Sequence, residues 1–279
     1  MNRTLIFRNL HSDHNKPLVL PNIWDAGGAR IVESLGAKAV ATTSAGVAWS
    51  KGYPDGNVMP ARFLVHLAGE IVKAVKVPVS IDFEAGYSDK PSVVVENLKP
   101  IVAAGISGIN IEDGTDEPTL LAKKIEAIKK MASSEGVDIF VNARTDVYLQ
   151  DLVADDKKVN ETLERAATYQ GAGADGLFVP GLTDTVAISK ITKGTGLPVN
   201  LMSDSALPKA DVLAKINVRR LSAGITLTTI IYKHFARLAG NFLKEGDCGI
   251  FDEDAMTFSE IQGLFAERNL LTSTSTLHA

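Results

Sequence analysis

Cysteine is nearly absent from this chain of 279 residues, which contains only Cys248. One cysteine cannot close a disulfide within the chain, and there is no CxxC pair or Cys/His cluster to bind zinc or to carry out redox chemistry. A disulfide-rich or zinc-stabilised fold is therefore excluded, and we expect a reducing, cytoplasmic location.

An excess of positive charge is missing as well. The 29 lysines and arginines face 33 aspartates and glutamates, which gives a formal net charge of -4. Proteins that bind a phosphate backbone need a basic stripe to neutralise it, and the sequence has none. Nucleic acid is therefore not an expected partner.

Long apolar runs are also missing. The first twenty residues alternate polar and apolar side chains and lack the apolar stretch of a signal peptide. The most apolar region, residues 224–243, is interrupted by Lys233, His234 and Arg237, whose charges are costly at the centre of a membrane. We therefore expect neither export nor a membrane span, and interpret residues 224–243 as a packing helix.

The chain does contain a repeated alternation of short Val-, Ile- and Leu-rich runs with segments whose apolar residues recur every three or four positions. This alternation predicts βα units and a parallel sheet that is buried on both faces. The predicted strands are 18–22, 38–43, 78–83, 108–112, 138–144, 175–179, 197–201 and 218–222. The predicted helices are 25–35, 60–75, 91–104, 118–134, 157–170, 183–193, 207–214 and 224–244.

Eight such units in a chain of this length favour an α/β fold of the (β/α)8 TIM-barrel type. Glycine turns precede alternate strands at Gly36, Gly105 and Gly173, and the phosphate-binding GxGxxG of an open doubly wound sheet is absent. We therefore expect one barrel domain, residues 1–245, followed by a C-terminal helical extension and tail, residues 246–279.

Acidic side chains gather where two predicted strands end. Asp82 and Glu84 follow the third strand, and Glu112 ends the fourth. Because active sites of such barrels lie at the carboxyl ends of the strands, these acids would converge, and their repulsion would be costly without a cation or shared protons. Oxygen ligands without histidine or cysteine favour Mg²⁺ or Mn²⁺. The alternative is that Arg144, lysines and backbone amides neutralise the acids without a metal.

Other polar residues near the predicted strand ends are candidates for substrate binding and catalysis. Arg144 could clamp a substrate carboxylate with its planar guanidinium, or form an ion pair inside the barrel. Ser44 and the adjacent backbone amides could bind an anionic group, although a turn serine explains the same spacing. The expected substrate-binding residues are Thr42, Ser44, Ala45, Gly46, Asn142 and Arg144, and Arg144 is also an expected catalytic residue.

Five phrases occur in order along the chain: LPNIWDAGGARIVESLGAKAVATTSAGVA, GYPDGN, VPVSIDFEAGYSD, AGISGINIEDG and VNARTDVY. Together they resemble the isocitrate lyase and phosphoenolpyruvate mutase superfamily over residues from about 18 to about 225. The acid pair followed by GY, together with IED one strand later, is the most specific part of this resemblance.

The resemblance implies a Mg²⁺-dependent barrel that acts on small 2-oxo or 2-hydroxy carboxylates through an enolate-like species. It implies that Asp82 is the direct metal ligand and that Glu84 and Glu112 hold metal-bound waters. It also implies that Arg144 and Ser44 hold the substrate and that Asp55 is a catalytic residue that approaches the reacting group. Members of the superfamily also exchange their last helix between subunits, which implies a homodimer or homotetramer.

The chain departs from the superfamily in the loop after the fourth strand, which reads GTDEPTLLAKK and lacks the cysteine and histidine of the lyases. The loop lysine and asparagine of the mutases are also missing, as is the histidine of the sixth strand end. Reactions that need little beyond a metal and an enolate could still proceed without these residues. We therefore expect a metal-dependent lyase that decarboxylates or cleaves a small acid, with water or Tyr87 relaying the proton. A phosphonopyruvate mutase or hydrolase and a non-catalytic carboxylate-binding barrel are the alternatives.

Overall fold

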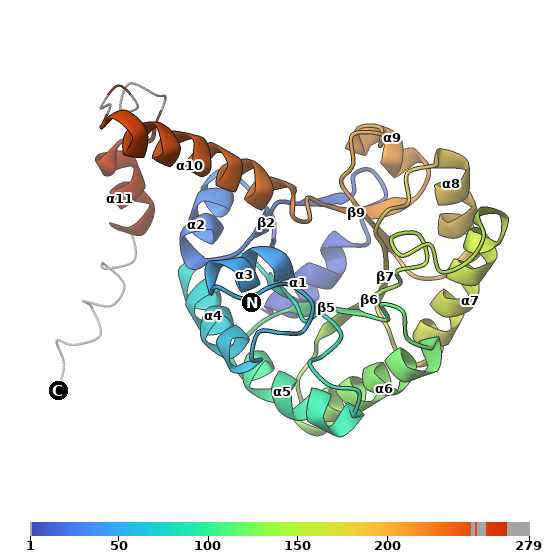
Figure 1. Ribbon diagram of the computed structural model, residues 1–279. Helices are drawn as coiled ribbons and strands as arrows, with labels where there is room; N and C mark the ends of the chain where they lie inside the picture. The colour runs from blue at the N-terminus through green and yellow to red at the C-terminus, as the bar shows by residue number, and fades with distance from the viewer. Residues whose placement is uncertain (1, 247–248, 250–254, 267–279) are drawn as a thin grey trace, which may run out of the picture.

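The computed structural model describes residues 2–246, 249 and 255–266. Its strands are β1 (Leu18–Leu20), β2 (Asn22–Ile23), β3 (Val40–Thr42), β4 (Val79–Asp82), β5 (Gly108–Glu112), β6 (Phe140–Arg144), β7 (Gly176–Val179), β8 (Val199–Met202) and β9 (Val218–Ser222). They form one parallel sheet in the order β1-β9-β8-β7-β6-β5-β4-β3-β2. Because β1 and β2 are consecutive in the chain, the sheet curls into a nearly closed barrel (Figure 1). The predicted TIM-barrel fold is confirmed.

The prediction of one continuous first strand over residues 18–22 is wrong. Pro21 has no N–H to donate to a strand ladder, and it divides this segment into two short strands. β1 pairs with β9 and β2 pairs with β3, so the two halves close the barrel from opposite sides of the proline.

Seven helices surround the barrel (Figure 1). They are α2 (Ala26–Ser34), α4 (Arg62–Ala74), α5 (Pro91–Ala103), α6 (Pro118–Ser134), α7 (Lys158–Gly171), α8 (Thr185–Gly194) and α9 (Ala210–Lys215). Each lies within a few residues of its predicted range. Two helices were not predicted: α1 (Arg3–Leu10), whose first turn is capped by the side chain of Asn2, and α3 (Ser44–Ser50), which follows β3 directly.

Side chains alternate along each strand between the barrel interior and the surrounding helices. Ile81, Ile109 and Val141 belong to the main core between strands and helices. A second apolar cluster fills the N-terminal half of the barrel interior and consists of Phe7, Leu18, Leu20, Ala39, Ala41 and Phe140. Since Phe7 comes from α1, this helix closes the N-terminal end and leaves the carboxyl ends of the strands for a site.

The ring of helices is open after β9. There α10 (Thr226–Glu245) runs outward from the barrel, beyond α2 (Figure 1). Val19 on β1 is consequently 51% exposed, and an apolar cavity of about 860 Å³ lies between β1, α2 and the start of α10.

Beyond α10, the helix α11 (Phe258–Ala266) returns to α2, where the Arg30 side chain donates hydrogen bonds to the carbonyl oxygen of Leu264. Of the predicted C-terminal extension and tail, residues 246–279, the segments 247–248, 250–254 and 267–279 lie outside the described residues. None of the helices within residues 2–246 and 255–266 combines the length and the apolar character that a membrane span requires.

Candidate active site

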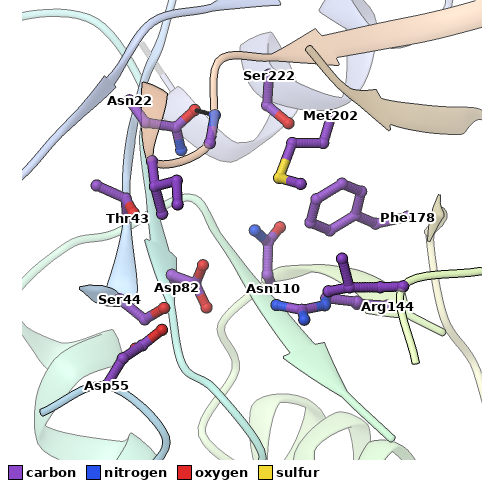
Figure 2. Close-up of a pocket in the computed structure, with 13 residues that line it drawn as sticks. Asn22, Thr43, Ser44, Asp55, Asp82, Asn110, Arg144, Phe178, Met202 and Ser222 are labelled. Carbon is purple, nitrogen blue, oxygen red and sulfur yellow. Dashed lines mark hydrogen bonds between the residues drawn. The ribbon is translucent and has the colours of Figure 1, made fainter. Parts of the chain in front are cut away.

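Polar side chains from several strand ends surround a cavity of about 200 Å³ at the carboxyl end of the barrel (Figure 2). It is smaller than the pockets of about 300–1,000 Å³ that hold drug-sized ligands, and suits a small organic acid. The lining residues are Asn22, Thr43, Ser44, Asp55, Asp82, Asn110, Arg144, Leu149, Phe178, Met202, Ser222, Gly224 and Ile225.

Asp82 is the last residue of β4, and its carboxylate faces the cavity (Figure 2). Its backbone N–H donates to Oγ1 of Thr42 at 2.8 Å, which ties the ends of β3 and β4 together. Burial raises the pKa of Asp82 to about 6; Arg144 opposes this shift, and the carboxylates of Glu84 and Asp55 add to it. When ionised, Asp82 is therefore a poorly solvated negative charge.

Glu84 and Tyr87 do not line the cavity. Both have left-handed backbone conformations, with φ of 49° and 59°, so the chain turns sharply after β4. The Glu84 carboxylate accepts hydrogen bonds from the backbone N–H of Asn57 and from the Tyr87 hydroxyl. Burial, together with Glu84, raises the pKa of Tyr87 above its ordinary value. The expected proton relay through Tyr87 has no support in this geometry, because its hydroxyl is bound to Glu84.

Arg144, the last residue of β6, lies between two acids at the edge of the cavity. Its Nη1 is 2.6 Å from Oε2 of Glu112, and its Nε and Nη2 donate to the carboxylate of Asp146 at 2.6 and 3.0 Å. Burial raises the pKa of Glu112 to about 8, although Arg144 opposes this shift. Burial alone would lower the pKa of Arg144, but Glu112 and Asp146 outweigh it and hold the guanidinium charged.

The three predicted metal ligands do not converge on one point. Among the described residues there is no group of three His, Cys, Asp or Glu side chains placed to hold a metal ion together. Asp82 faces the cavity, Glu84 is bound to the Asn57 loop, and Glu112 is bound to Arg144. Burial is the main cause of the raised pKa values of Asp82 and Glu112; neighbouring carboxylates add to it, and Arg144 opposes it. Of the three predicted ligands only Asp82 lines the cavity, so the residues present fit a cation held by one carboxylate rather than a cage of three.

The remaining predicted residues divide into two groups. Ser44 and Asp55 line the cavity with Arg144. The others are buried outside the cavity lining: Thr42 receives the Asp82 N–H, Ala45 and Gly46 lie inside α3, and Asn142 bonds to two neighbouring asparagines.

The expected binding residues did not include several polar residues of the lining, among them Asn22, Thr43, Asn110 and Ser222. A signal for Asn110 was present, because it lies two positions before Glu112 on the same strand and so shares its face. A signal for Asn22 was present too, because it is the last residue of the predicted strand 18–22. Ser222 lies beside Met202 across the β8–β9 pair.

The family model described as phosphoenolpyruvate phosphomutase matches residues 7–243. The chain belongs to this family. Its relatives place it in the isocitrate lyase and phosphoenolpyruvate mutase superfamily, as the sequence motifs indicated.

Three curated relatives of this family member span most of its length. An uncharacterised protein of Mycobacterium tuberculosis is 38% identical over 222 residues, covering 78% of this chain and 81% of its own. A 2,3-dimethylmalate lyase of Eubacterium barkeri is 28% identical over 285 residues, which are 95% of this chain and 94% of the lyase. An oxaloacetate decarboxylase of Rhodopseudomonas palustris is 29% identical over 218 residues, which are 71% of this chain and 70% of the decarboxylase.

Among solved structures, a protein of Burkholderia cenocepacia provisionally named a phosphonomutase superposes with a TM-score of 0.80 at 39% identity. The match covers 86% of this chain and all of the other. The family thus contains carbon–carbon lyases and mutases built on this barrel.

Proposed function

We propose that this family member is a divalent-metal-dependent decarboxylase of small 2-oxo dicarboxylic acids, and thus a carbon–carbon lyase. The observation that carries the proposal is the composition of the 200 Å³ cavity, whose lining joins one guanidinium, Arg144, to the acid Asp82. Within the described residues, that lining includes no Cys, His, Lys or Tyr side chain. Such a site can bind and polarise an organic acid, but it has no side chain suited to protonate a carbon leaving group.

Arg144 is suited to hold a substrate carboxylate. A guanidinium has five N–H donors, and Glu112 and Asp146 occupy three of them. The other donors remain for a carboxylate oxygen, with which charge-assisted hydrogen bonds are strong. Because both acids already fix the guanidinium, little conformational freedom is lost when the substrate binds.

Asp82 would hold the cation, and Glu84 and Glu112 lie close enough to interact electrostatically with Asp82. Bound there, the cation would polarise the 2-oxo group and offset the negative charge that develops on it. Burial strengthens this electrostatic effect, because Asp82 and Arg144 act where little water screens them.

Decarboxylation suits the remaining groups better than cleavage of a 2-hydroxy acid. The bond to the terminal carboxylate breaks, CO₂ leaves without needing a proton, and the electron pair passes into the enolate of the shorter 2-oxo acid. Water supplies the one proton that completes the product, and Asp55 in the cavity lining is available to hold that water. Cleavage of a 2-hydroxy acid needs both a base for the hydroxyl and an acid for the departing carbon. The names of the decarboxylase and lyase relatives support this choice of reaction class.

A phosphonate reaction is the second candidate, favoured by the family description and by the name of the Burkholderia relative. A phosphonate adds as many as two negative charges to those of the carboxylate. Since Arg144 is the one cationic side chain in the described lining, a dicarboxylate fits the available charge better.

The test is an assay of the Mg²⁺-loaded protein with oxaloacetate, phosphonopyruvate and 2,3-dimethylmalate, corrected for the uncatalysed loss of CO₂. We expect CO₂ release from oxaloacetate that EDTA abolishes and that Asp82→Ala reduces by about 100-fold or more. Asp211→Ala, which removes an exposed acid of α9, serves as the control and retains activity. Turnover of phosphonopyruvate alone supports the second candidate instead, and binding of all three acids without turnover supports a non-catalytic barrel.

A further inference from the structure

Arg220 is a buried cation without an acidic partner. It lies on β9 inside the barrel and is 1% exposed. Among the described residues no carboxylate lies within ion-pair distance of it, and its Nε and Nη1 have no hydrogen-bond partner. Its remaining nitrogen, Nη2, donates to Oδ1 of Asn110 at 3.3 Å. Burial lowers the pKa of Arg220 to about 10, and Asp82 opposes that shift. Such a charge is costly to bury, so the barrel holds it at the expense of stability.

Arg220 is the first member of a hydrogen-bond chain across the barrel interior. Oδ1 of Asn110 accepts from Arg220 and, at 2.9 Å, from Nδ2 of Asn142. Nδ2 of Asn142 also donates to Oδ1 of Asn200 at 3.0 Å. Asn200 in turn donates from Nδ2 to the carbonyl oxygen of Leu201 at 2.7 Å.

The direction of this chain is determined at both ends. An arginine can only donate, so the atom of Asn110 that it contacts must be the amide oxygen. A backbone carbonyl can only accept, so the atom of Asn200 that contacts Leu201 must be the amide nitrogen. Both constraints require the same orientation of Asn142 between them. The orientation of the Asn110 amide is therefore not an arbitrary choice between two similar ends.

The consequence appears at the cavity. Asn110 lines it, whereas Arg220 does not. With Oδ1 engaged from behind, Asn110 presents its Nδ2 on the side of Asp82 (Figure 2). The position offers two N–H donors where a bound acid would place its oxygens.

We propose that Asn110 donates a hydrogen bond from Nδ2 to an oxygen of the bound acid, and that Arg220 is the positioning residue that holds Asn110 in this orientation. The inference rests on the proposed function in that it assumes an acidic ligand in the cavity. To that function the inference adds Asn110 as a ligand-binding residue and Arg220 as a buried residue that acts through Asn110. The unpaired charge of Arg220 then has a role that offsets its cost to the fold.

The test is the affinity for oxalate in the presence of Mg²⁺, measured by calorimetry, together with the midpoint of thermal unfolding. Oxalate resembles the enolate of a short 2-oxo acid, and its binding is independent of turnover. We expect Arg220→Met to weaken oxalate binding about tenfold. The unfolding midpoint should stay the same or rise, because the variant removes an unpaired buried charge.

Arg219→Met is the matched control. Arg219 is the neighbouring arginine on β9 and is also buried, but it contacts His14 and Asn217 and lies away from the cavity lining. Its substitution should leave oxalate affinity unchanged. Arg220→Lys, which retains a donor-only group, should restore most of the affinity, while Arg220→Gln should not. The Lys and Gln variants decide the question even where Arg220→Met does not fold.

A double-mutant cycle separates positioning from a direct effect of charge. In an Asn110→Leu background, which itself binds oxalate weakly, Arg220→Met should cause little further loss. An undiminished tenfold loss in that background, or wild-type affinity in Arg220→Met, overturns the proposal. Oxalate binding without oxaloacetate turnover overturns the proposed function and leaves this inference standing, whereas a wild-type protein that binds no oxalate overturns both.

Discussion

A buried carboxylate such as Asp82 destabilises the fold whenever it is ionised. Its pKa of about 6 lies above the ordinary value of 3.8 because burial disfavours the charged form. The native state therefore binds this proton more tightly than the unfolded chain does. The stability that the group contributes is complete below about pH 4 and is lost as the pH rises through about 6.

We expect Asp82→Asn to be more stable than the wild type at pH 8 in EDTA, by about 1–3 kcal/mol. Asparagine keeps the shape of the side chain but never ionises, so the advantage should shrink as the pH falls toward 4. Urea unfolding at both pH values measures it, with Asp211→Asn as the exposed control. If the variant is less stable than the wild type at pH 8, the ionised Asp82 stabilises the fold through its contacts, which contradicts the prediction.

At the scale of elements, the segment between α3 and α4, residues 51–61, carries Asp55, and a hydrogen-bond cluster around Asn57 holds it against the end of β4. The backbone N–H of Asn57 donates to Glu84, and its Oδ1 accepts from the backbone N–H groups of Ala85 and Tyr87. Glu84 and Tyr87 therefore position the segment that brings Asp55 to the cavity.

We expect Asn57→Gly to loosen this segment without straining it, because glycine tolerates the φ of 61° while losing the Oδ1 acceptor. Amide hydrogen exchange in residues 51–61 should rise about tenfold, and turnover should fall with it. Asn217→Gly is the matched control, since Asn217 has a similar φ of 63° at the other end of the barrel. Unchanged exchange in residues 51–61 would mean that other contacts hold the segment.

The barrel could be predicted from the sequence because each buried strand and amphipathic helix is a strong local pattern. The missed elements are those whose patterns are short: α3 has seven residues, and α1 buries only Thr4 and Phe7. At the site, strand-end positions identified Asp82, Arg144 and Ser44, and the superfamily resemblance identified Asp55; all four line one cavity.

What the sequence could not reveal is where side chains turn after a strand ends. Glu84 was expected beside Asp82, but the left-handed turn directs it to Asn57. Asn110 and Arg220 were missed because their importance depends on contacts between strands that are far apart in the chain.

At the scale of the whole molecule, the opening after β9 leaves apolar surface uncovered. Leu227 and Ile231 of α10 line the 860 Å³ cavity with residues of α2, and Phe235 further along α10 is 71% exposed. Patches of this kind mark interfaces. We propose that α10 of a second copy covers this surface, which agrees with the dimer or tetramer implied by the superfamily resemblance.

We expect Phe235→Glu to shift the protein toward monomers, because it places a charge in the proposed interface. Sedimentation velocity measures the change across a concentration series. Val186→Glu on α8 is the control, since Val186 is 60% exposed and lies on a helix of the ring away from α10. A wild-type protein that sediments as a monomer at every concentration would contradict the proposed assembly.

The central claim is that Asp82 holds a divalent cation beside Arg144, so that an organic acid can bind to both. Mn²⁺ titration followed by electron paramagnetic resonance tests it most directly, with and without oxalate. We expect one Mn²⁺ site in the wild type, whose affinity oxalate increases, and no such site in Asp82→Ala. Equal Mn²⁺ binding by the two proteins, with no effect of oxalate, would contradict it.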